Sequence, residues 1–256
     1  MKVSVEIPVF KHRYLNEAIE SVLQQSFEDW HLYLLSDGGS RKAQEIMRTW
    51  STDPRISVRF EENRGIGVSR RTLAEWSTSE FIFPMDDDDV IFENCLSEMV
   101  GCMEAFPEAG IVRARRAFVD KKGRRLDRAC WFPFAPRKMI YGMTSDVHNH
   151  SQPVLIRRRA YNRTDGWFGF KEFGGAGEDC DIFLKIEEVA DIVLLDKVLY
   201  GYRLHRSRYS RDLGPKSAYE MWRRLADITI QRRGLKIRRT NEKPPFTYVK
   251  ISLLSG

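Results

Sequence analysis

Apolar positions in the first ninety residues follow two alternating spacings. Runs in which every residue or every second residue is apolar predict short strands, and runs with apolar residues three and four positions apart predict helices. The predicted strands cover residues 3–10, 31–35, 56–60 and 81–85, and the helices between them cover residues 14–23, 43–50 and 66–74. Strands that alternate with helices in this way predict a mostly parallel sheet with helices on both faces.

The pattern is less regular in the remainder of the chain. It predicts helices over residues 96–103, 178–189 and 215–233, and strands over residues 111–120, 192–195 and 198–204. Residues 129–143 are rich in aromatic residues and proline and predict a long loop, which in a compact domain is usually functional. Pro244 and Pro245 predict an irregular segment near the end of the sequence.

The composition indicates a soluble globular protein. The chain has 256 residues, of which 42% are hydrophobic and 30% are charged, so it can bury a sizeable core and is not a disordered chain. No uncharged stretch approaches the roughly 18 to 20 residues of a membrane-spanning helix, and the first residues do not form a secretory signal. The four cysteines form no CxxC pair, which fits reduced thiols. We therefore expect a cytoplasmic protein.

The charge is concentrated near the end of the sequence. The formal net charge of the whole chain is +6, whereas residues 201–256 hold 14 basic and 4 acidic side chains, a net charge of +10. Such a segment suits contact with nucleic acid, an anionic membrane surface or a phosphorylated substrate.

Four adjacent carboxylates, Asp86 to Asp89, directly follow the strand predicted over residues 81–85. Neighbouring charges of one sign repel by several kcal/mol at an effective dielectric constant near 20, so the run favours a bound cation or bound protons. In an extended segment Asp86 and Asp88 point one way and Asp87 and Asp89 the other. Ligands of such sheets bind outside the carboxyl ends of the strands. The alternative is a solvated acidic loop in which Asp89 caps the next helix.

Seven segments together resemble glycosyltransferase family 2, whose members have the GT-A fold. They occur in the order expected for that family over residues 1 to about 210, and each would be a weak signal alone. The segments are EIPVF, NEAIESVLQQSF, LLSDGGS, NRGIGVSRRTLA, FIFPMDDDDV, GGAGEDCDIFLKI and YRLHRSRYS.

The resemblance implies an α/β protein with a GT-A domain over residues 1–210. Residues 1–90 would form the nucleotide-binding half, with a mostly parallel sheet flanked by helices. Residues 91–210 would form a smaller acceptor and catalytic half, and residues 211–256 a basic helical extension.

The resemblance also implies roles for the acidic run. Asp88 would bind the metal ion, and Asp86 or Asp87 would bind the ribose, with the register uncertain by one residue because the run has one more carboxylate than the family motif needs. An open coordination sphere with few protein ligands suits Mg²⁺ or Mn²⁺. His205 would contact the metal or the diphosphate, and imidazole suits Mn²⁺ better.

The family pattern assigns the catalytic base to Asp179, beside Glu178. Adjacent side chains on a helix point about 100° apart, so one of the two faces the acceptor. Acidic residues also favour the first turn of a helix without any catalytic reason. Lys185 stands where the family usually has arginine, and this departure does not affect the assignment of the catalytic base.

The nucleotide would be held at the ends of the first two strands. The resemblance implies that Asp37 accepts a hydrogen bond from uracil N3, and that Pro8 and Phe10 line the base pocket. Arg70, with Arg64 as a further candidate, would contact the base or a phosphate. Ser36 replaces a second aspartate that the family often has, and Asp37 before two glycines is also an ordinary turn residue.

The sequence therefore predicts a metal-dependent, inverting hexosyltransferase of polysaccharide or glycoconjugate biosynthesis. It would move a sugar from a nucleotide diphosphate, expected to be UDP, to a hydroxyl of a sugar, lipid-linked or other acceptor. One alternative is a nucleotidyltransferase, although VFKHRY occupies the place of its glycine-rich loop. The other is a nucleic-acid-binding protein that uses the basic tail, whereas the enzyme is expected to bind no nucleic acid.

The basic tail is expected to hold the acceptor or the membrane that carries it. Arg223, Arg224, Arg232 and Arg233 lie in two pairs on the last predicted helix. Each basic residue near an anionic surface contributes about 1 kcal/mol, which predicts peripheral contact with the inner membrane face. The alternative is a solvated basic helix packed on the catalytic domain through its apolar face.

Overall fold

A computed structural model describes residues 1–129, 153–171, 176–205, 214–234, 237–239 and 248–250 of the chain. The predicted aromatic loop, apart from its first residue, and the Pro244–Pro245 segment lie outside the described residues.

Within these residues the main sheet has nine strands in the order β3-β2-β1-β4-β8-β6-β9-β5, with β7 paired to β6. The first four strands in space are parallel, as the alternation of strands and helices predicts. They are β1 (Val3–Val9), β2 (Trp30–Asp37), β3 (Ile56–Glu61) and β4 (Phe81–Pro84). All seven residues of β1 are buried, which fits its place inside the sheet.

The second half of the sheet is mixed in direction. β8 (Val154–Arg157) is antiparallel to both β4 and β6 (Ala109–Val119), so β4 and β6 run the same way. β6 is parallel to β9 (Asp191–Arg203). The carboxyl ends of β1, β2, β4, β6 and β9 therefore lie at one edge of the sheet. β5 (Val90–Ile91) and β7 (Arg125–Ala129) add antiparallel edges.

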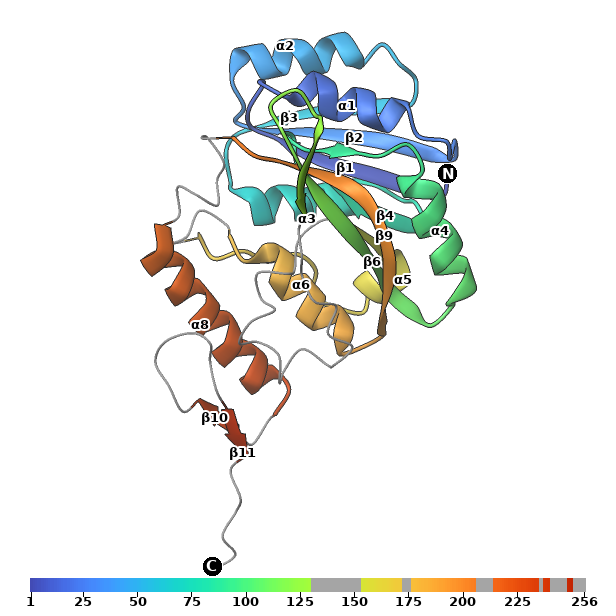
Figure 1. The fold of residues 1–256 in the computed structure, drawn as a ribbon. Coiled ribbons are helices and arrows are strands. Elements are labelled where there is room, and N and C mark those ends of the chain that lie inside the picture. Colours follow the sequence, from blue (N-terminus) through green and yellow to red (C-terminus); the bar gives the residue numbers. More distant parts are fainter. Residues whose placement is uncertain (130–152, 172–175, 206–213, 235–236, 240–247, 251–256) are drawn as a thin grey trace, which may run out of the picture.

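Helices cover both faces of the sheet (Figure 1). α1 (Leu15–Leu23), α2 (Arg41–Trp50) and α4 (Cys95–Ala105) share one large apolar core with the strands. α3 (Ile66–Trp76), α5 (Arg158–Tyr161) and α6 (Glu178–Glu187) pack on the opposite face, around a second apolar cluster that includes Trp167. This two-faced packing is the α/β architecture that the sequence predicts.

Several elements differ from the expected pattern, including β5 and β7, for which the sequence predicted no strand. Residues 191–203 form one strand instead of two, because Leu195 pairs with Ala114 and Val198 with Arg115, so the polar pair between them bulges out without ending the ladder. β8 and α5 were not expected at all. Each has four residues, which is too short to show a period.

Arginines at the β8–α5 junction secure two helix ends. Arg157 Nη2 donates to Met103 O at 2.7 Å, near the end of α4. Arg158 Nη1 donates to Ala74 O at 2.7 Å, near the end of α3. The last carbonyl groups of a helix lack partners within the helix and carry partial negative charge, so buried guanidinium groups stabilise both ends.

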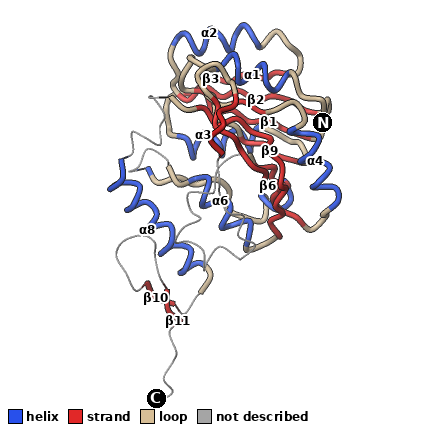
Figure 2. Tube along the Cα trace, viewed as in Figure 1, coloured by secondary structure: helices blue, strands red, loops and turns tan. Residues whose placement is uncertain are grey.

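α8 (Gly214–Arg232) is packed on α6, and Figure 2 shows the two helices side by side. A separate apolar cluster joins them and consists of Phe170, Ala176, Cys180, Leu184, Met221, Leu225 and Ala226. Ion pairs add to this contact, with Arg232 Nε 2.9 Å from Glu188 Oε1 and Arg233 Nη2 3.1 Å from Glu187 Oε2. A short antiparallel ribbon follows, formed by β10 (Ile237–Arg239) and β11 (Tyr248–Lys250).

Candidate functional site

The acidic run lies directly after β4, at the edge of the sheet where the parallel strands end. Asp86, Asp88 and Asp89 each offer a carboxylate oxygen, and these atoms lie within 4.8 Å of one another. Oxygen atoms that converge in this way suit a hard divalent cation.

Two of the four carboxylates are bound to backbone N–H groups of distant segments. Asp87 Oδ2 accepts hydrogen bonds from Phe10 N and Lys11 N, both at 2.8 Å. Asp89 Oδ1 accepts from Arg203 N at 2.8 Å, and Asp89 Oδ2 accepts from the Tyr200 hydroxyl at 2.8 Å. These bonds fix the run against the end of β1 on one side and the end of β9 on the other.

The other two carboxylates bind side chains. Asp88 Oδ2 lies 2.8 Å from His205 Nε2, and Asp86 Oδ1 accepts from Arg70 Nη2 at 2.5 Å. Asp86 and Asp88 share one side of the run as expected, but Asp89 joins them there, contrary to the expected alternation. The reason is that Asp87 and Asp88 form a turn, so the run is not an extended strand.

Burial and mutual repulsion raise the pKa values of the acidic run. Burial, followed by the charge of Asp88, raises the pKa of Asp87 to about 7. The same two causes raise the pKa of Asp89 well above its ordinary value. Burial also raises the pKa of Asp86, although the Arg70 guanidinium opposes that rise. The run is thus poised to exchange protons for a cation.

β9 brings His205 to the acidic run although the two are far apart in sequence. His205 follows the end of the strand, its side chain is 2% exposed, and its ring centroid lies 5.1 Å from that of Tyr14. The ring is therefore held in place while Nε2 faces Asp88.

The buried contact of Arg203, on the last position of β9, with the acidic run was not predicted from the sequence. Its side chain is almost fully buried, and its Nε donates to the backbone oxygen of Asp88 at 2.7 Å. The guanidinium lies over the Tyr14 ring, 4.5 Å from the centroid. The signal available in the sequence was a charged residue at the buried end of an apolar strand.

Arg70 lies between the acidic run and the start of α6. It is 3% exposed, and its Nε is 3.5 Å from Glu178 Oε1 while its Nη2 holds Asp86. Trp167 contributes a ring whose centroid is 5.6 Å from the guanidinium carbon. Arg70 thus joins carboxylates from the two halves of the site.

Glu178 and Asp179 open α6 after Gly177, whose φ of 90° places it in the left-handed region that favours glycine. Burial, followed by the charge of Asp179, raises the pKa of Glu178 to about 8, while Arg70 opposes the rise. Burial also raises the pKa of Asp179, but the N–H of Cys180 donates to Asp179 Oδ1 at 2.8 Å and lowers it. The environment favours protonated Glu178 beside a more readily ionised Asp179.

Asp37 stands at the end of β2 and binds the loop before α3. Its Oδ1 accepts from Arg64 N at 2.7 Å and its Oδ2 from Gly65 N at 3.1 Å. Pro8 is buried near the end of β1, whereas Phe10 just beyond the strand is 49% exposed. The Arg64 guanidinium turns away to Glu61 and Thr72. The structure therefore gathers Asp37, Pro8 and Phe10 at the ends of neighbouring strands.

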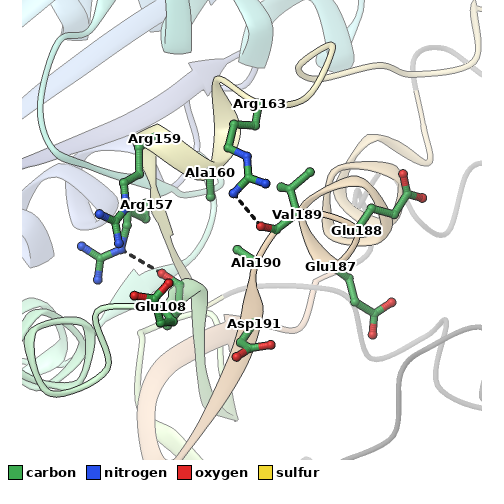
Figure 3. A pocket seen from close by; sticks show the side chains of 11 residues that line it. Glu108, Arg157, Arg159, Ala160, Arg163, Glu187, Glu188, Val189, Ala190 and Asp191 are labelled. Atoms are coloured by element: carbon green, nitrogen blue, oxygen red, sulfur yellow. Dashed lines mark hydrogen bonds between the residues drawn. The ribbon is translucent and has the colours of Figure 1, made fainter.

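A groove of about 610 Å³ lies at the opposite edge of the sheet, beside the first residues of β6 and β9 (Figure 3). Its arginines hold backbone oxygens, with Arg157 Nε 2.8 Å from Ala109 O and Arg163 Nη1 2.7 Å from Val189 O. The groove lacks the converging carboxylates of the acidic run, so the carboxyl edge is the candidate functional site.

The model of the family described as glycosyl transferase family 2 matches residues 4–164. Chondroitin synthase of Escherichia coli is 22% identical over 263 residues, which is 97% of this chain and 36% of that protein. Hyaluronan synthase of Pasteurella multocida is 25% identical over 210 residues, which is 79% of this chain and 20% of that protein. The chain thus spans about a third or less of the length of these relatives.

Solved structures of similar fold cover most of the chain. Staphylococcus aureus TarS 1–349 in complex with UDP-GlcNAc has a TM-score of 0.71 and 19% identity, over 90% of this chain and 66% of that chain. Mannosyltransferase PcManGT from Pyrobaculum calidifontis, in complex with GDP-Man and Mn²⁺, has a TM-score of 0.66 and 15% identity, over 90% of this chain and 64% of that chain.

These comparisons agree with the α/β architecture of the described residues. Among the described residues, no helix is both long enough and apolar enough to cross a membrane. Because the family model matches more than half of the chain, the chain belongs to glycosyl transferase family 2, and the similar solved structures show that it has the GT-A fold.

Proposed function

We propose that this chain transfers a sugar from a nucleotide diphosphate sugar to an acceptor hydroxyl, with a divalent metal ion and with inversion at the anomeric carbon. The observation that carries the proposal is the acidic run at the carboxyl edge, joined through Arg70 to the start of α6. This arrangement supports the proposal, because groups that suit a diphosphate and groups that suit a proton transfer have Arg70 as a common partner.

Asp88 and His205 are the proposed metal ligands. Asp88 Oδ2 and His205 Nε2 lie 2.8 Å apart, and oxygens of Asp86 and Asp89 lie within 4.8 Å of the oxygen of Asp88, so the donor set fits Mn²⁺ or Mg²⁺. Mn²⁺ is favoured because an imidazole is part of the set. When bound, the ion would neutralise the charge that develops on the departing diphosphate.

The nucleotide is proposed to lie between β1, β2 and α3. Asp37 is fixed by two backbone N–H groups and keeps lone pairs that can accept the N3–H of uracil. Pro8 and Phe10 would line the base, and Asp87 holds the backbone of Phe10 in place. The similarity to a structure that contains UDP-GlcNAc supports a UDP-sugar.

Asp86 is the proposed ribose ligand, with Asp87 as the alternative that the register leaves open. Arg70 would hold Asp86 in position and would add positive charge near the base or diphosphate. Because Arg70 is 3% exposed, its charge acts in surroundings that screen it weakly.

Asp179 is the proposed catalytic base. Its carboxylate would take the proton of the acceptor hydroxyl as the acceptor oxygen forms a bond to the anomeric carbon. The bond from that carbon to the diphosphate oxygen breaks in the same displacement, and the nucleoside diphosphate leaves with the electron pair. Attack opposite the leaving group inverts the anomeric configuration. Glu178, kept protonated by its surroundings, would leave the negative charge at Asp179.

The remaining proposals concern organisation and surroundings. Residues 1–90 would bind the donor, residues 91–210 would bind the acceptor and supply the base, and residues 211–256 would be a basic extension. The acceptor hydroxyl would belong to a polysaccharide or glycoconjugate, which fits the chondroitin and hyaluronan synthases among the relatives. A cytoplasmic location with peripheral contact at an anionic membrane follows from the basic extension.

A thermal-shift screen with UDP, GDP, dTDP and CDP, each with and without Mn²⁺, tests the proposal. A ligand that binds the folded state raises stability by mass action, so we expect the largest shift with UDP and Mn²⁺ together. A thermal shift with UDP that is the same with and without Mn²⁺ would contradict the proposed metal site. A larger shift with GDP would contradict the assignment of the base.

A further inference from the structure

The turn between β6 and β7 is a rigid, strongly basic structure. It has the sequence DKKGRR over residues 120–125. Asp120 Oδ1 accepts from Lys122 N at 2.8 Å and Arg124 N at 3.0 Å, and Gly123 has a φ of 75°, so the backbone is fixed by its own hydrogen bonds. The basic side chains of the turn therefore project from a defined frame.

The charge of this turn faces solvent. Lys121, Lys122, Arg124 and Arg125 are all exposed. Asp120 Oδ2 pairs with Arg124, whose side chain is 73% exposed, at 2.8 Å. One acidic and four basic side chains leave a net charge of +3 on six residues. A surface of this charge density attracts anions over about 8 Å at physiological ionic strength.

Arg203 connects the turn to the acidic run. Its Nη1 donates to Asp120 O at 3.2 Å and to Lys121 O at 3.0 Å, while its Nε donates to the backbone oxygen of Asp88. The basic turn is therefore one side chain away from the proposed metal ligand. If Asp88 binds the metal ion as proposed, the turn would lie near the diphosphate of the donor.

The Arg203 guanidinium is also incompletely satisfied. The residue is 1% exposed, its Nη1 and Nε bind three backbone oxygens, and its Nη2 has no hydrogen-bond partner. Nη2 faces the turn, since a Cβ placed on Gly123 would lie 3.8 Å from it. A buried guanidinium with an unmatched N–H favours a nearby anion.

We propose that the β6–β7 turn binds the anionic groups of a charged glycan acceptor and so directs the end of that chain to the transfer site. This inference rests on the proposed function, because it names the class of acceptor for the same site. Carboxylate or phosphate groups along a glycan match a fixed array of exposed cations. The turn offers no aromatic side chain on which a nucleobase could stack, which favours a glycan over single-stranded nucleic acid.

Binding of charged and uncharged oligomers to the whole 256-residue chain tests the proposal. The probes are unsulfated chondroitin oligosaccharides, which carry carboxylates, inorganic polyphosphate, neutral dextran oligosaccharides and single-stranded DNA. The variant is the double substitution Lys121→Gln and Lys122→Gln. The matched control is Arg41→Gln with Lys42→Gln, which removes two exposed charges from α2.

We expect chondroitin or polyphosphate to bind the parent protein at low salt, and we expect dextran not to bind. The affinity of the turn variant for the bound anionic probe should fall about tenfold, whereas the control variant should keep the affinity of the parent. Equal losses in both variants would overturn the proposal, as would DNA binding that is tighter than glycan binding and equally sensitive to the turn. The UDP and Mn²⁺ thermal shift is measured on all three proteins. If the parent protein shows the thermal shift but the turn variant binds glycan as tightly as the parent, only the inference about the acceptor fails. If the parent protein shows no thermal shift with UDP and Mn²⁺, the proposed function itself is contradicted.

Discussion

Replacing Glu178 by glutamine tests whether Glu178 is protonated while Asp179, the next residue of α6, carries the negative charge. Glutamine keeps the size of the side chain and an oxygen that can face Arg70 Nε, but it cannot ionise. Burial, followed by the charge of Asp179, raises the pKa of Glu178 from 4.5 to about 8. At neutral pH the parent side chain is therefore mostly protonated, and the variant resembles it.

The size of the expected change in the free energy of unfolding follows from the shift in the pKa of Glu178. Each pKa unit corresponds to about 1.4 kcal/mol, so a rise from 4.5 to about 8 corresponds to on the order of 5 kcal/mol. A carboxyl group whose pKa is raised by folding contributes stability that is fully present below about pH 4.5 and is lost as the pH rises through about 8. The glutamine variant cannot lose this contribution. Its free energy of unfolding should therefore fall less than that of the parent between about pH 5 and pH 9.

Urea unfolding followed by circular dichroism at about pH 5, 7 and 9 measures this difference. Glu20→Gln, at an exposed position on α1, is the matched control and should follow the parent at every pH. Glu178→Gln should also retain transfer activity near neutral pH, because Asp179 remains. The reasoning is refuted if the parent and Glu178→Gln lose stability in parallel, since Glu178 would then be ionised throughout and would compete with Asp179 as the base.

Three further predictions address the proposed site and the basic extension. Asp88→Ala should abolish the metal dependence of UDP binding, and the fold should be kept because losing one carboxylate also relieves repulsion within the acidic run. UDP titrations with and without Mn²⁺ measure this effect. An unchanged Mn²⁺ dependence would show that Asp88 is not a metal ligand. Asp179→Asn should keep donor binding and lower turnover by about 10² to 10⁴-fold; near-normal initial rates would point to Glu178 instead. The chain should co-sediment with anionic liposomes at low salt and detach at high salt, and failure to bind at low salt would leave membrane contact without support.

The first half of the fold could be predicted from the sequence because its elements are long enough to show a period. The seven strands and helices up to Pro84 are found where apolar spacing indicates them. β8 could not be predicted in the same way. Its four residues are all buried and show no alternation, and their place between β4 and β6 depends on pairing across the chain.

The candidate site could be predicted to the extent that its residues belong to short local motifs. Asp86 to Asp89 and the Glu178–Asp179 pair are recognisable as short segments, and the family comparisons support the class of enzyme over a nucleotidyltransferase or a nucleic-acid-binding protein. The role of Arg70 as a bridge was not predictable, because its two carboxylate partners come from separate segments that only the folded sheet brings together.

The packing of α8 on α6 has a consequence for shortened forms of the chain. A fragment that stops near residue 210 would lack Met221 and Leu225, which cover Cys180 and Leu184 on the helix that carries Asp179. That fragment would expose an apolar stripe to water and would be prone to self-association. The residue before α6 would also lose a neighbour, since a Cβ placed on Gly177 would lie 3.3 Å from Met221 Sδ. The smallest fragment that stays soluble with an ordered α6 should therefore extend past Arg232.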